Sequence, residues 1–185
     1  MSLADTLNVV VRALDAAGIP HMLAGSLAST YHGEPRATQD IDIVVDPPSR
    51  DALDHFVASL PRDRFYVGDH HAAFARREPF NVIDTTTGWK VDLIVRRDRA
   101  YSHAELERRQ PADIEGIPVF VATAEDTILT KLEWAKLGES ERQLRDVEAI
   151  VRALGDSLDR SYLLAWATEL GVLPELERVV PEAGR

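Results

Sequence analysis

The segment TQDIDIVVD, residues 38–46, decides the fold and points to the chemistry. Its β-branched residues predict a strand, and the two prolines that follow predict where this strand ends. Side chains two residues apart lie on the same face of a strand. Asp40 and Asp42 therefore project together, while the aliphatic residues between and after them face a core.

Two carboxylates on one face repel each other unless a cation lies between them. Mg²⁺ relieves this conflict, because it prefers oxygen ligands and commonly combines one or two carboxylates with phosphate oxygens. A third acid, Asp92, lies in the apolar run WKVDLIV, residues 89–95. If the two strands pair, the three acids converge and could hold two Mg²⁺ ions, one at an attacking hydroxyl and one at the phosphates of a nucleotide.

The turn before the first strand is a candidate phosphate-binding segment. Gly25 and Ser26 lie in AGSLAST, residues 24–30, between a predicted strand over 19–25 and a predicted helix over 26–33. Glycine allows close backbone approach, and the N–H groups that begin a helix favour an anion such as a triphosphate. Arg36 and Thr38 could also contact phosphate, although a polar loop before a strand needs no such role.

The remaining pattern predicts an α+β fold with a helical C-terminal part. Amphipathic spacing predicts a helix that starts after Ser2 and ends at Gly18, a second helix covers about residues 49–60, and residues 80–95 read as a β-hairpin. A short strand over 117–122 precedes a capping-box pattern at Thr123 and Asp126, and helices follow to the end. We expect a core over residues 1–110 and a helical region over 111–185, with no composition-biased linker between them.

Composition excludes several functional classes. The chain of 185 residues has no cysteine, which rules out disulfides, zinc-thiolate sites and cysteine nucleophiles. Its formal charge of 21 − 31 = −10 argues against nonspecific binding of nucleic acid by the whole surface, although arginines cluster between residues 76 and 109. The absence of any run near the ~20 apolar residues that span a bilayer, together with an acidic N-terminus, leads us to expect a cytoplasmic protein.

A second possible metal site consists of His70 and His71, which follow Asp69. Two adjacent histidines in a loop, without a partner at ligand spacing, are more often solvated than bound to a metal. We therefore expect a solvated pair here.

Two longer stretches resemble known families. AGSLASTYHGEPRATQDIDIVVD, residues 24–46, resembles the signature of the DNA polymerase β-like nucleotidyltransferase superfamily, with Ala24-Gly25-Ser26 in place of a double glycine. EDTILTKLEWAK, residues 125–136, with RQLRDVEAI, residues 142–150, is similar to the C-terminal helices of bacterial minimal nucleotidyltransferases of the AbiEii toxin type. The resemblance implies a nucleotidyltransferase-like mixed β-sheet flanked by helices.

The resemblance also implies an activity. Such enzymes move a nucleoside monophosphate from an NTP to a hydroxyl acceptor, release pyrophosphate and use two Mg²⁺ ions. It implies a phosphate-binding turn at Gly25 and Ser26, metal ligands at Asp40 and Asp42, and at Asp92 a third acid that activates the acceptor. The resemblance to the toxin type adds Lys131 and Asp146 as catalytic candidates. Lys131 could reach the triphosphate, and Asp146 could orient Lys131 by an ion pair or complete the site.

Partners and alternatives stay open at this point. The resemblance favours RNA, particularly a tRNA 3′ end, as acceptor and a cognate antitoxin as protein partner, and the Arg-rich middle segment gives RNA modest support. A small molecule such as an aminoglycoside, or a protein hydroxyl, is the alternative acceptor. The base of the NTP, ATP included, is not fixed. The alternative is a noncatalytic module that senses nucleotide or binds a protein, which would not need all three acids.

Overall fold

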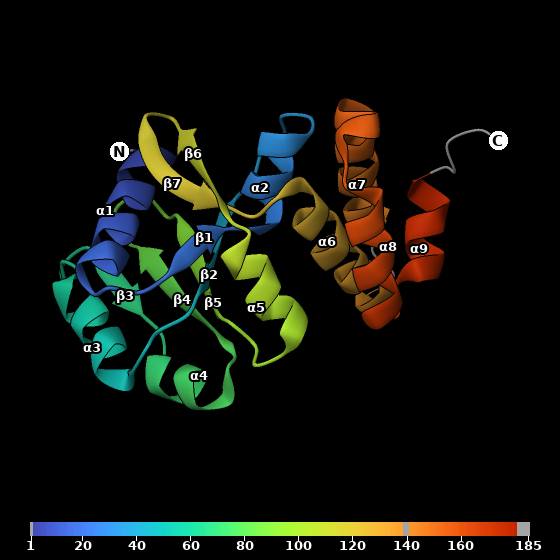
Figure 1. The fold of residues 1–185 in the computed structure, drawn as a ribbon. Helices are drawn as coiled ribbons and strands as arrows, with labels where there is room; N and C mark the ends of the chain where they lie inside the picture. Colours follow the sequence, from blue (N-terminus) through green and yellow to red (C-terminus); the bar gives the residue numbers. More distant parts are fainter. Residues whose placement is uncertain (1, 139–140, 181–185) are drawn as a thin grey trace. The chain divides into compact units, whose positions relative to one another are not determined.

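The computed structural model describes residues 2–138 and 141–180 (Figure 1). Strands and helices alternate through the first two thirds, and helices follow. The strands are β1 (His21–Leu23), β2 (Asp40–Val45), β3 (Phe65–Val67), β4 (Pro79–Asp84), β5 (Lys90–Val95), β6 (Gln110–Ile114) and β7 (Ile117–Val121). The helices are α1 (Leu3–Ala16), α2 (Gly25–His32), α3 (Arg50–Ser59), α4 (His70–Arg76), α5 (Ala100–Glu107), α6 (Ala124–Gly138), α7 (Glu141–Leu154), α8 (Arg160–Glu169) and α9 (Leu173–Val179), with a 3₁₀ turn η1 (Gly155–Ser157).

The described strands form one mixed sheet in the order β3-β4-β5-β2-β1-β7-β6. The pairs β2–β5 and β1–β7 are parallel, and the remaining pairs are antiparallel. Strands β4 and β5 form the hairpin predicted over residues 80–95. The prediction of an α+β fold with a mixed sheet flanked by helices is confirmed.

The two faces of β2 have different surroundings. Ile41 and Ile43 are fully buried, and α1 and α3, which contact each other, supply further fully buried side chains. On the opposite face, Val44 packs in a small cluster with Met22 and with Leu106 of α5. The face that carries Asp40 and Asp42 is therefore apolar toward the end of the strand and polar only at its beginning.

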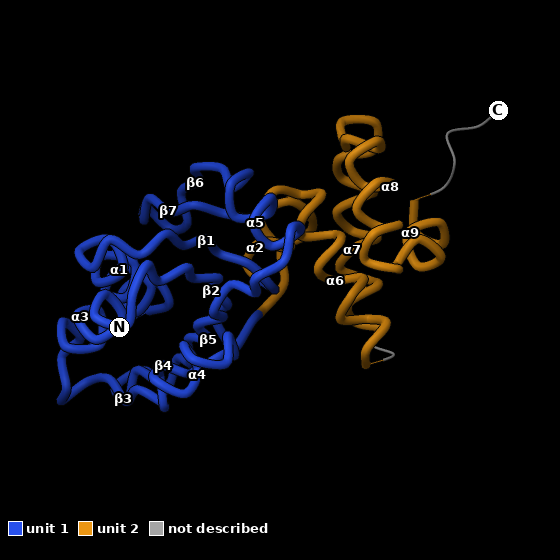
Figure 2. The backbone as a smooth tube through the Cα atoms, turned by 60° about the horizontal axis from the view of Figure 1, so that its bottom comes forward, with its two compact units in different colours: residues 1–26, 38–122 blue, residues 27–37, 123–185 orange. Residues whose placement is uncertain are grey.

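The chain divides into two compact units (Figure 2). Unit 1 comprises residues 1–26 and 38–122, and unit 2 comprises residues 27–37 and 123–185. This division differs from the expected boundary at residue 110. The hairpin of β6 and β7 belongs to unit 1 because β7 pairs with β1. Residues 27–37 belong to unit 2, where Gly33 lies so close to α7 that a Cβ there would be 3.1 Å from the Ile150 backbone nitrogen.

Both predicted caps are present, and the one at Ser2 is a complete capping box. Ser2 accepts a hydrogen bond from the Asp5 backbone N–H, and the Asp5 carboxylate accepts one from the Ser2 N–H in return. Before α6, the Thr123 hydroxyl donates to Asp126 Oδ2 over 2.6 Å and accepts from the Asp126 N–H over 3.2 Å. The Tyr162 hydroxyl of α8 donates to the other oxygen of the buried Asp126 over 2.7 Å. The Asp126 carboxylate at the start of α6 therefore also joins this helix to α8.

Four short elements lie where no regular structure was predicted, namely β3, α4, α5 and β6. The most consequential is α4, because its first two residues are His70 and His71, which were expected in a loop. Asp69 begins this helix by accepting a hydrogen bond from the Ala72 N–H over 3.0 Å. The helix ends after seven residues at Arg77, whose φ of 52° lies in the left-handed region. So short a helix has too few turns to show clear periodicity.

Within the described residues, no helix is both long enough and apolar enough to cross a membrane.

Candidate active site

The predicted carboxylates lie together on unit 1. In the parallel pair of β2 and β5, Asp42 lies directly opposite Asp92, and Asp40 lies opposite Lys90. All four side chains are on one face and partly exposed, whereas Ile41 and Val91, which point the other way, are fully buried. The buried face fixes the register, because a slip of one residue would turn the acids into the core. The three acids are therefore held together by the packing beneath them.

Gly25 is in direct contact with this group. Its φ is +55°, and a Cβ at this position would lie 1.9 Å from Asp42 Oδ2. The preceding Ala24 N–H donates to the Asp42 carbonyl oxygen over 2.9 Å. Both the backbone conformation and the close approach require glycine. Ser26 follows as the second residue of α2.

Replacing Gly25 by alanine is expected to destabilise unit 1 strongly. A left-handed backbone costs an L-residue about 1–2 kcal/mol, and the overlap with Asp42 adds about 1–3 kcal/mol of overpacking strain. The matched control is Gly88→Ala, because Gly88 has φ +79° and no atom within 4 Å of its Cβ position. Urea unfolding of both variants measures the difference. An equal loss of stability in the two would show that the contact with Asp42 carries no cost.

Lys90 also belongs to the site, although it is not among the residues that the sequence pattern predicted. Its Nζ lies 2.7 Å from Asp92 Oδ2 and 4.0 Å from Asp40 Oδ2. The hydrogen bond to Asp92 raises the pKa of Lys90 above its ordinary value, so the amine is a cation at neutral pH. Lys90 could have been found by the alternation rule, because it lies two residues before Asp92 on the same strand.

The donor set fits Mg²⁺. Carboxylate oxygens from two adjacent strands are the ligands that this ion prefers. The ammonium of Lys90 already lies between two of the carboxylates, which shows that the group attracts a positive charge. The Thr38 hydroxyl donates to the Asp40 backbone oxygen over 3.0 Å and lies 3.2 Å from Asp40 Oδ1. Thr38 therefore orients a carboxylate of the site.

Unit 2 contains the other predicted residues in a cluster of its own. The buried Lys131 amine donates to Asp146 Oδ2 over 2.7 Å and to Gln143 Oε1 over 3.0 Å. Arg36, considered as a phosphate contact, donates to the same Asp146 oxygen over 2.9 Å. Burial by itself would raise the pKa of Asp146, but the hydrogen bonds from Lys131 and Arg36 outweigh it and the pKa is lowered. The ion pair between Lys131 and Asp146 is thus present.

No family model matches the sequence, and no curated protein matches it. Solved structures do match. The antibiotic-resistance factor ANT(2″)-Ia in solution is 16% identical, with 94% of this chain and 96% of that chain covered and a TM-score of 0.59. Its crystal structure with adenylyl-2″-tobramycin is 15% identical, covers 91% and 99% of the two chains, and has a TM-score of 0.60.

Two further structures agree with this likeness. The lincosamide adenylyltransferase LnuA with bound lincomycin is 11% identical, with 81% of this chain and 96% of that chain covered and a TM-score of 0.54. A nucleotidyltransferase-like protein from Paracoccidioides brasiliensis is 18% identical, with 93% and 89% covered and a TM-score of 0.53. The chain therefore has the nucleotidyltransferase fold, as the resemblance to the superfamily predicts.

Proposed function

We propose that this chain is a Mg²⁺-dependent nucleotidyltransferase that moves a nucleoside monophosphate from an NTP to a hydroxyl acceptor and releases pyrophosphate. One observation carries the proposal: Asp42 lies opposite Asp92 on paired strands, and the Gly25 backbone lies against the Asp42 carboxylate. Three acids on one exposed face, next to a glycine turn, have no structural need for one another. Their mutual repulsion is explained by a function that requires cations and phosphates.

The roles of the residues follow from their positions. Asp40, Asp42 and Asp92 would hold two Mg²⁺ ions, which when bound neutralise the triphosphate and favour the deprotonated hydroxyl. The acceptor oxygen forms a bond to the α-phosphorus, the bond from that phosphorus to the pyrophosphate oxygen breaks, and Asp92 takes the hydroxyl proton. The N–H groups after Gly25 would bind phosphate oxygens. Lys90 supplies a cation next to the acids, since its Nζ lies 2.7 Å from Asp92 Oδ2, and would pair with a phosphate oxygen of the NTP.

The finer assignments rest on the resemblance to the AbiEii toxin type. They comprise catalytic roles for Lys131 and Asp146, a cognate antitoxin as partner and RNA, such as tRNA, as acceptor. The two residues are buried and hydrogen-bonded, which suits a fixed and oriented amine. These roles stay predictions, and so does a cytoplasmic location.

The acceptor could instead be a small molecule. The chain carries a formal charge of −10, which attracts polycations more readily than it attracts RNA. By their names, one of the similar structures is an antibiotic-resistance factor, which was also solved with adenylyl-2″-tobramycin, and another is a lincosamide antibiotic adenylyltransferase. A cationic, hydroxyl-rich compound of the aminoglycoside kind is therefore the second acceptor class to test.

A noncatalytic module is the alternative function, and the position of Lys90 favours it specifically. Its ammonium already compensates the charge of Asp92 and part of that of Asp40. If Lys90 kept this position, the acids could be stable without metal, and the protein would bind nucleotide or a partner without transferring phosphate.

Incubation with each α-labelled NTP tests these functions. The purified chain is given Mg²⁺ and either total tRNA or a panel of aminoglycosides and lincosamides, with EDTA as the matched control. We expect label on one acceptor class and pyrophosphate release, both abolished by EDTA. Saturable NTP binding without pyrophosphate release would support the noncatalytic module. Absence of any NTP binding with Mg²⁺ would refute the nucleotide-dependent functions altogether.

A further inference from the structure

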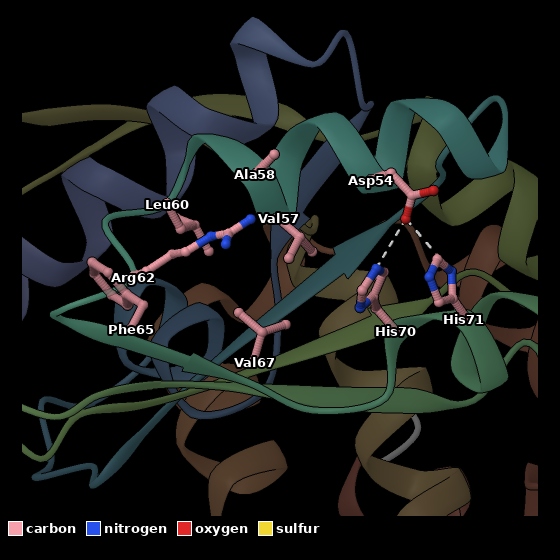
Figure 3. A pocket seen from close by; sticks show the side chains of 9 residues that line it. All are labelled: Asp54, Val57, Ala58, Leu60, Arg62, Phe65, Val67, His70 and His71. Carbon is pink, nitrogen blue, oxygen red and sulfur yellow. Dashed lines mark hydrogen bonds and ion pairs between the residues drawn. The ribbon is translucent and has the colours of Figure 1, made fainter.

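A second polar cluster lies in unit 1, outside the site described above. It forms one end of a cavity of about 410 Å³ between α3, β3 and the start of α4 (Figure 3). The polar end consists of Asp54 from α3 with His70 and His71 from α4. The rest of the lining is mainly apolar and includes Val57, Leu60, Phe65 and Val67. These residues are separate from the carboxylates of β2 and β5, and they take no part in the proposed nucleotide transfer.

The three side chains point at one another. His70 Nε2 lies 3.0 Å from Asp54 Oδ1, and His71 Nδ1 lies 3.5 Å from the same oxygen. One ligand atom from each residue lies within 4.8 Å of those from the other two. In Figure 3 the Asp54 carboxylate faces both imidazole rings from the opposite helix. Small side-chain movements would thus bring three ligand atoms around one ion.

The hydrogen bond that His71 accepts makes the cluster receptive to a cation. Arg50 Nε lies 3.0 Å from His71 Nδ1. Arginine can only donate, so Nδ1 accepts this bond and carries a lone pair rather than a proton. That lone pair and the negatively charged Asp54 oxygen are 3.5 Å apart and repel each other. A metal ion bound by both atoms would turn this repulsion into attraction.

We propose that Asp54, His70 and His71 form a binding site for a divalent transition-metal ion such as Zn²⁺. Two imidazole nitrogens and one carboxylate oxygen are ligands that suit Zn²⁺, whereas Mg²⁺ prefers oxygen alone. Three protein ligands leave a fourth position of a tetrahedral site for water or for a ligand in the cavity. The side chain of His70 is 16% exposed and that of Asp54 is 43% exposed, so an ion can enter from solvent.

Metal binding has a structural consequence and an electrostatic cost. The ion would connect α3 to α4, two helices that already contact each other. It would also displace the guanidinium of Arg50 from His71, because both require the same lone pair. Arg50 therefore competes with the ion for His71, and its replacement should strengthen metal binding.

Calorimetric titration of the EDTA-stripped, full-length protein with Zn²⁺ tests the proposal. The titration is done with wild type and with Asp42→Asn. The acids of β2 and β5 could also bind Zn²⁺, and this variant weakens that second site. We expect one tight site in both proteins. Asp54→Asn or His71→Gln should weaken it by more than about 100-fold, because loss of a ligand exceeds the 10–100-fold effect of an outer partner. Arg50→Ala should strengthen it.

The matched control is His103→Gln. His103 Nε2 lies 3.0 Å from Asp98 Oδ1, so this exposed pair has the same chemistry as His70 with Asp54 but no second histidine of this cluster. Its loss should leave the Zn²⁺ affinity unchanged. Thermal unfolding in EDTA checks that every variant folds. Zn²⁺ affinities that are equal in wild type, Asp54→Asn and His71→Gln, or absence of tight binding by wild type, would overturn the proposal.

Discussion

Replacing Asp42 by asparagine is expected to lower the rate of nucleotide transfer by about 10³-fold while the fold stays intact. Loss of a single group that stabilises charge in the transition state costs ~10²–10³-fold in rate, and Asp42 would also bind metal. Asn keeps the shape of the side chain beside Gly25 but removes the negative charge. Asp42 lies opposite another acid, Asp92, and the Lys90 ammonium is hydrogen-bonded to Asp92, so loss of the Asp42 charge should cost the sheet little stability. Initial rates at saturating Mg²⁺, together with the urea midpoint, measure both effects.

The control for this variant is Asp63→Asn, which removes the same charge from an exposed position of unit 1 outside the acidic face. It should leave both the transfer rate and the urea midpoint unchanged. A wild-type rate in Asp42→Asn would show that the carboxylate does not take part in transfer. A large drop in the midpoint instead would show that Asp42 is needed for the fold, and the loss of activity would then say nothing about metal.

The sequence was sufficient to predict which side of each strand carries the acids, because that information is local. The alternation in residues 38–46 places Asp40 and Asp42 on one side, and the hairpin pattern places Asp92 on a strand. The parallel pairing of β2 with β5 brings the groups together. That pairing is non-local, so it could be assumed from the resemblance but not calculated from the pattern. The same alternation rule places Lys90 on the acidic face, since it lies two residues before Asp92 on β5.

Other features depend on contacts between distant residues and could not be read from the sequence. The cluster on α3 and α4 requires Asp54 to meet a histidine pair sixteen residues later. Its helix was hidden by its short length, although Asp69 carries an N-cap signal. Likewise, the assignment of residues 27–37 to unit 2 follows from the contact between Arg36 and Asp146, which are 110 positions apart.

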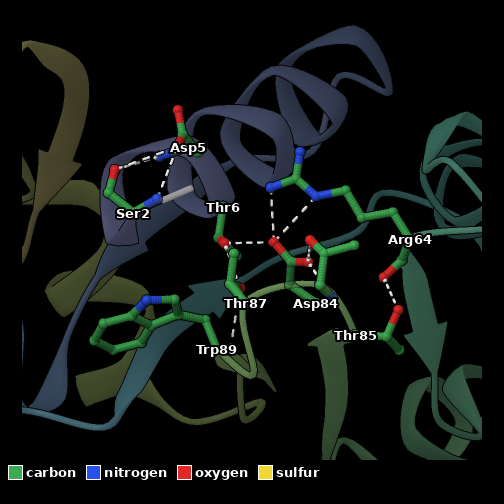
Figure 4. A network of polar contacts seen from close by, with 9 residues as sticks. Ser2, Asp5, Thr6, Arg64, Asp84, Thr85, Thr87 and Trp89 are labelled. Carbon is green, nitrogen blue, oxygen red and sulfur yellow. Dashed lines mark hydrogen bonds and ion pairs between the residues drawn. The ribbon is translucent and has the colours of Figure 1, made fainter.

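The second large effect concerns a buried ionic network at the hairpin of β4 and β5 (Figure 4). Asp84 is fully buried and accepts hydrogen bonds on Oδ2 from the Thr6 hydroxyl and from Arg64 Nη2, each over 2.6 Å. Its other oxygen accepts from the N–H and the hydroxyl of Thr86, over 3.1 Å and 2.6 Å, which shapes the hairpin turn. This one carboxylate therefore joins α1, the segment before β3 and the turn after β4.

Asp84→Ala is expected to lower the free energy of unfolding of unit 1 by about 3 kcal/mol. This value is at the lower end of the cost of breaking a buried ion pair, because the Arg64 side chain is 18% exposed and can be hydrated when Asp84 is absent. For a chain of this size that corresponds to a decrease in Tm of about 6–12 °C. Asp84→Asn, which keeps the shape and part of the hydrogen bonding, should lose less. The control is Glu78→Gln, which removes the exposed contact of 3.9 Å with Arg76 and should change stability by less than about 1 kcal/mol.

The pH dependence separates the charge of Asp84 from its shape. Burial alone would raise the pKa of Asp84, but the hydrogen bonds from Arg64, Thr6 and Thr86 outweigh it and hold the pKa far below its ordinary value. A carboxyl group with a lower pKa in the folded state stabilises the fold above its unfolded pKa of about 3.9 and loses this contribution as the pH falls toward the folded pKa. Wild type should therefore keep the contribution at pH 5–7 and lose it progressively below about pH 4. Urea unfolding at several pH values should show the gap between wild type and Asp84→Asn narrowing over that acidic range. A gap that stays constant down to pH 2 would show that shape and packing, rather than the ionised carboxylate, account for the stability that Asp84 contributes.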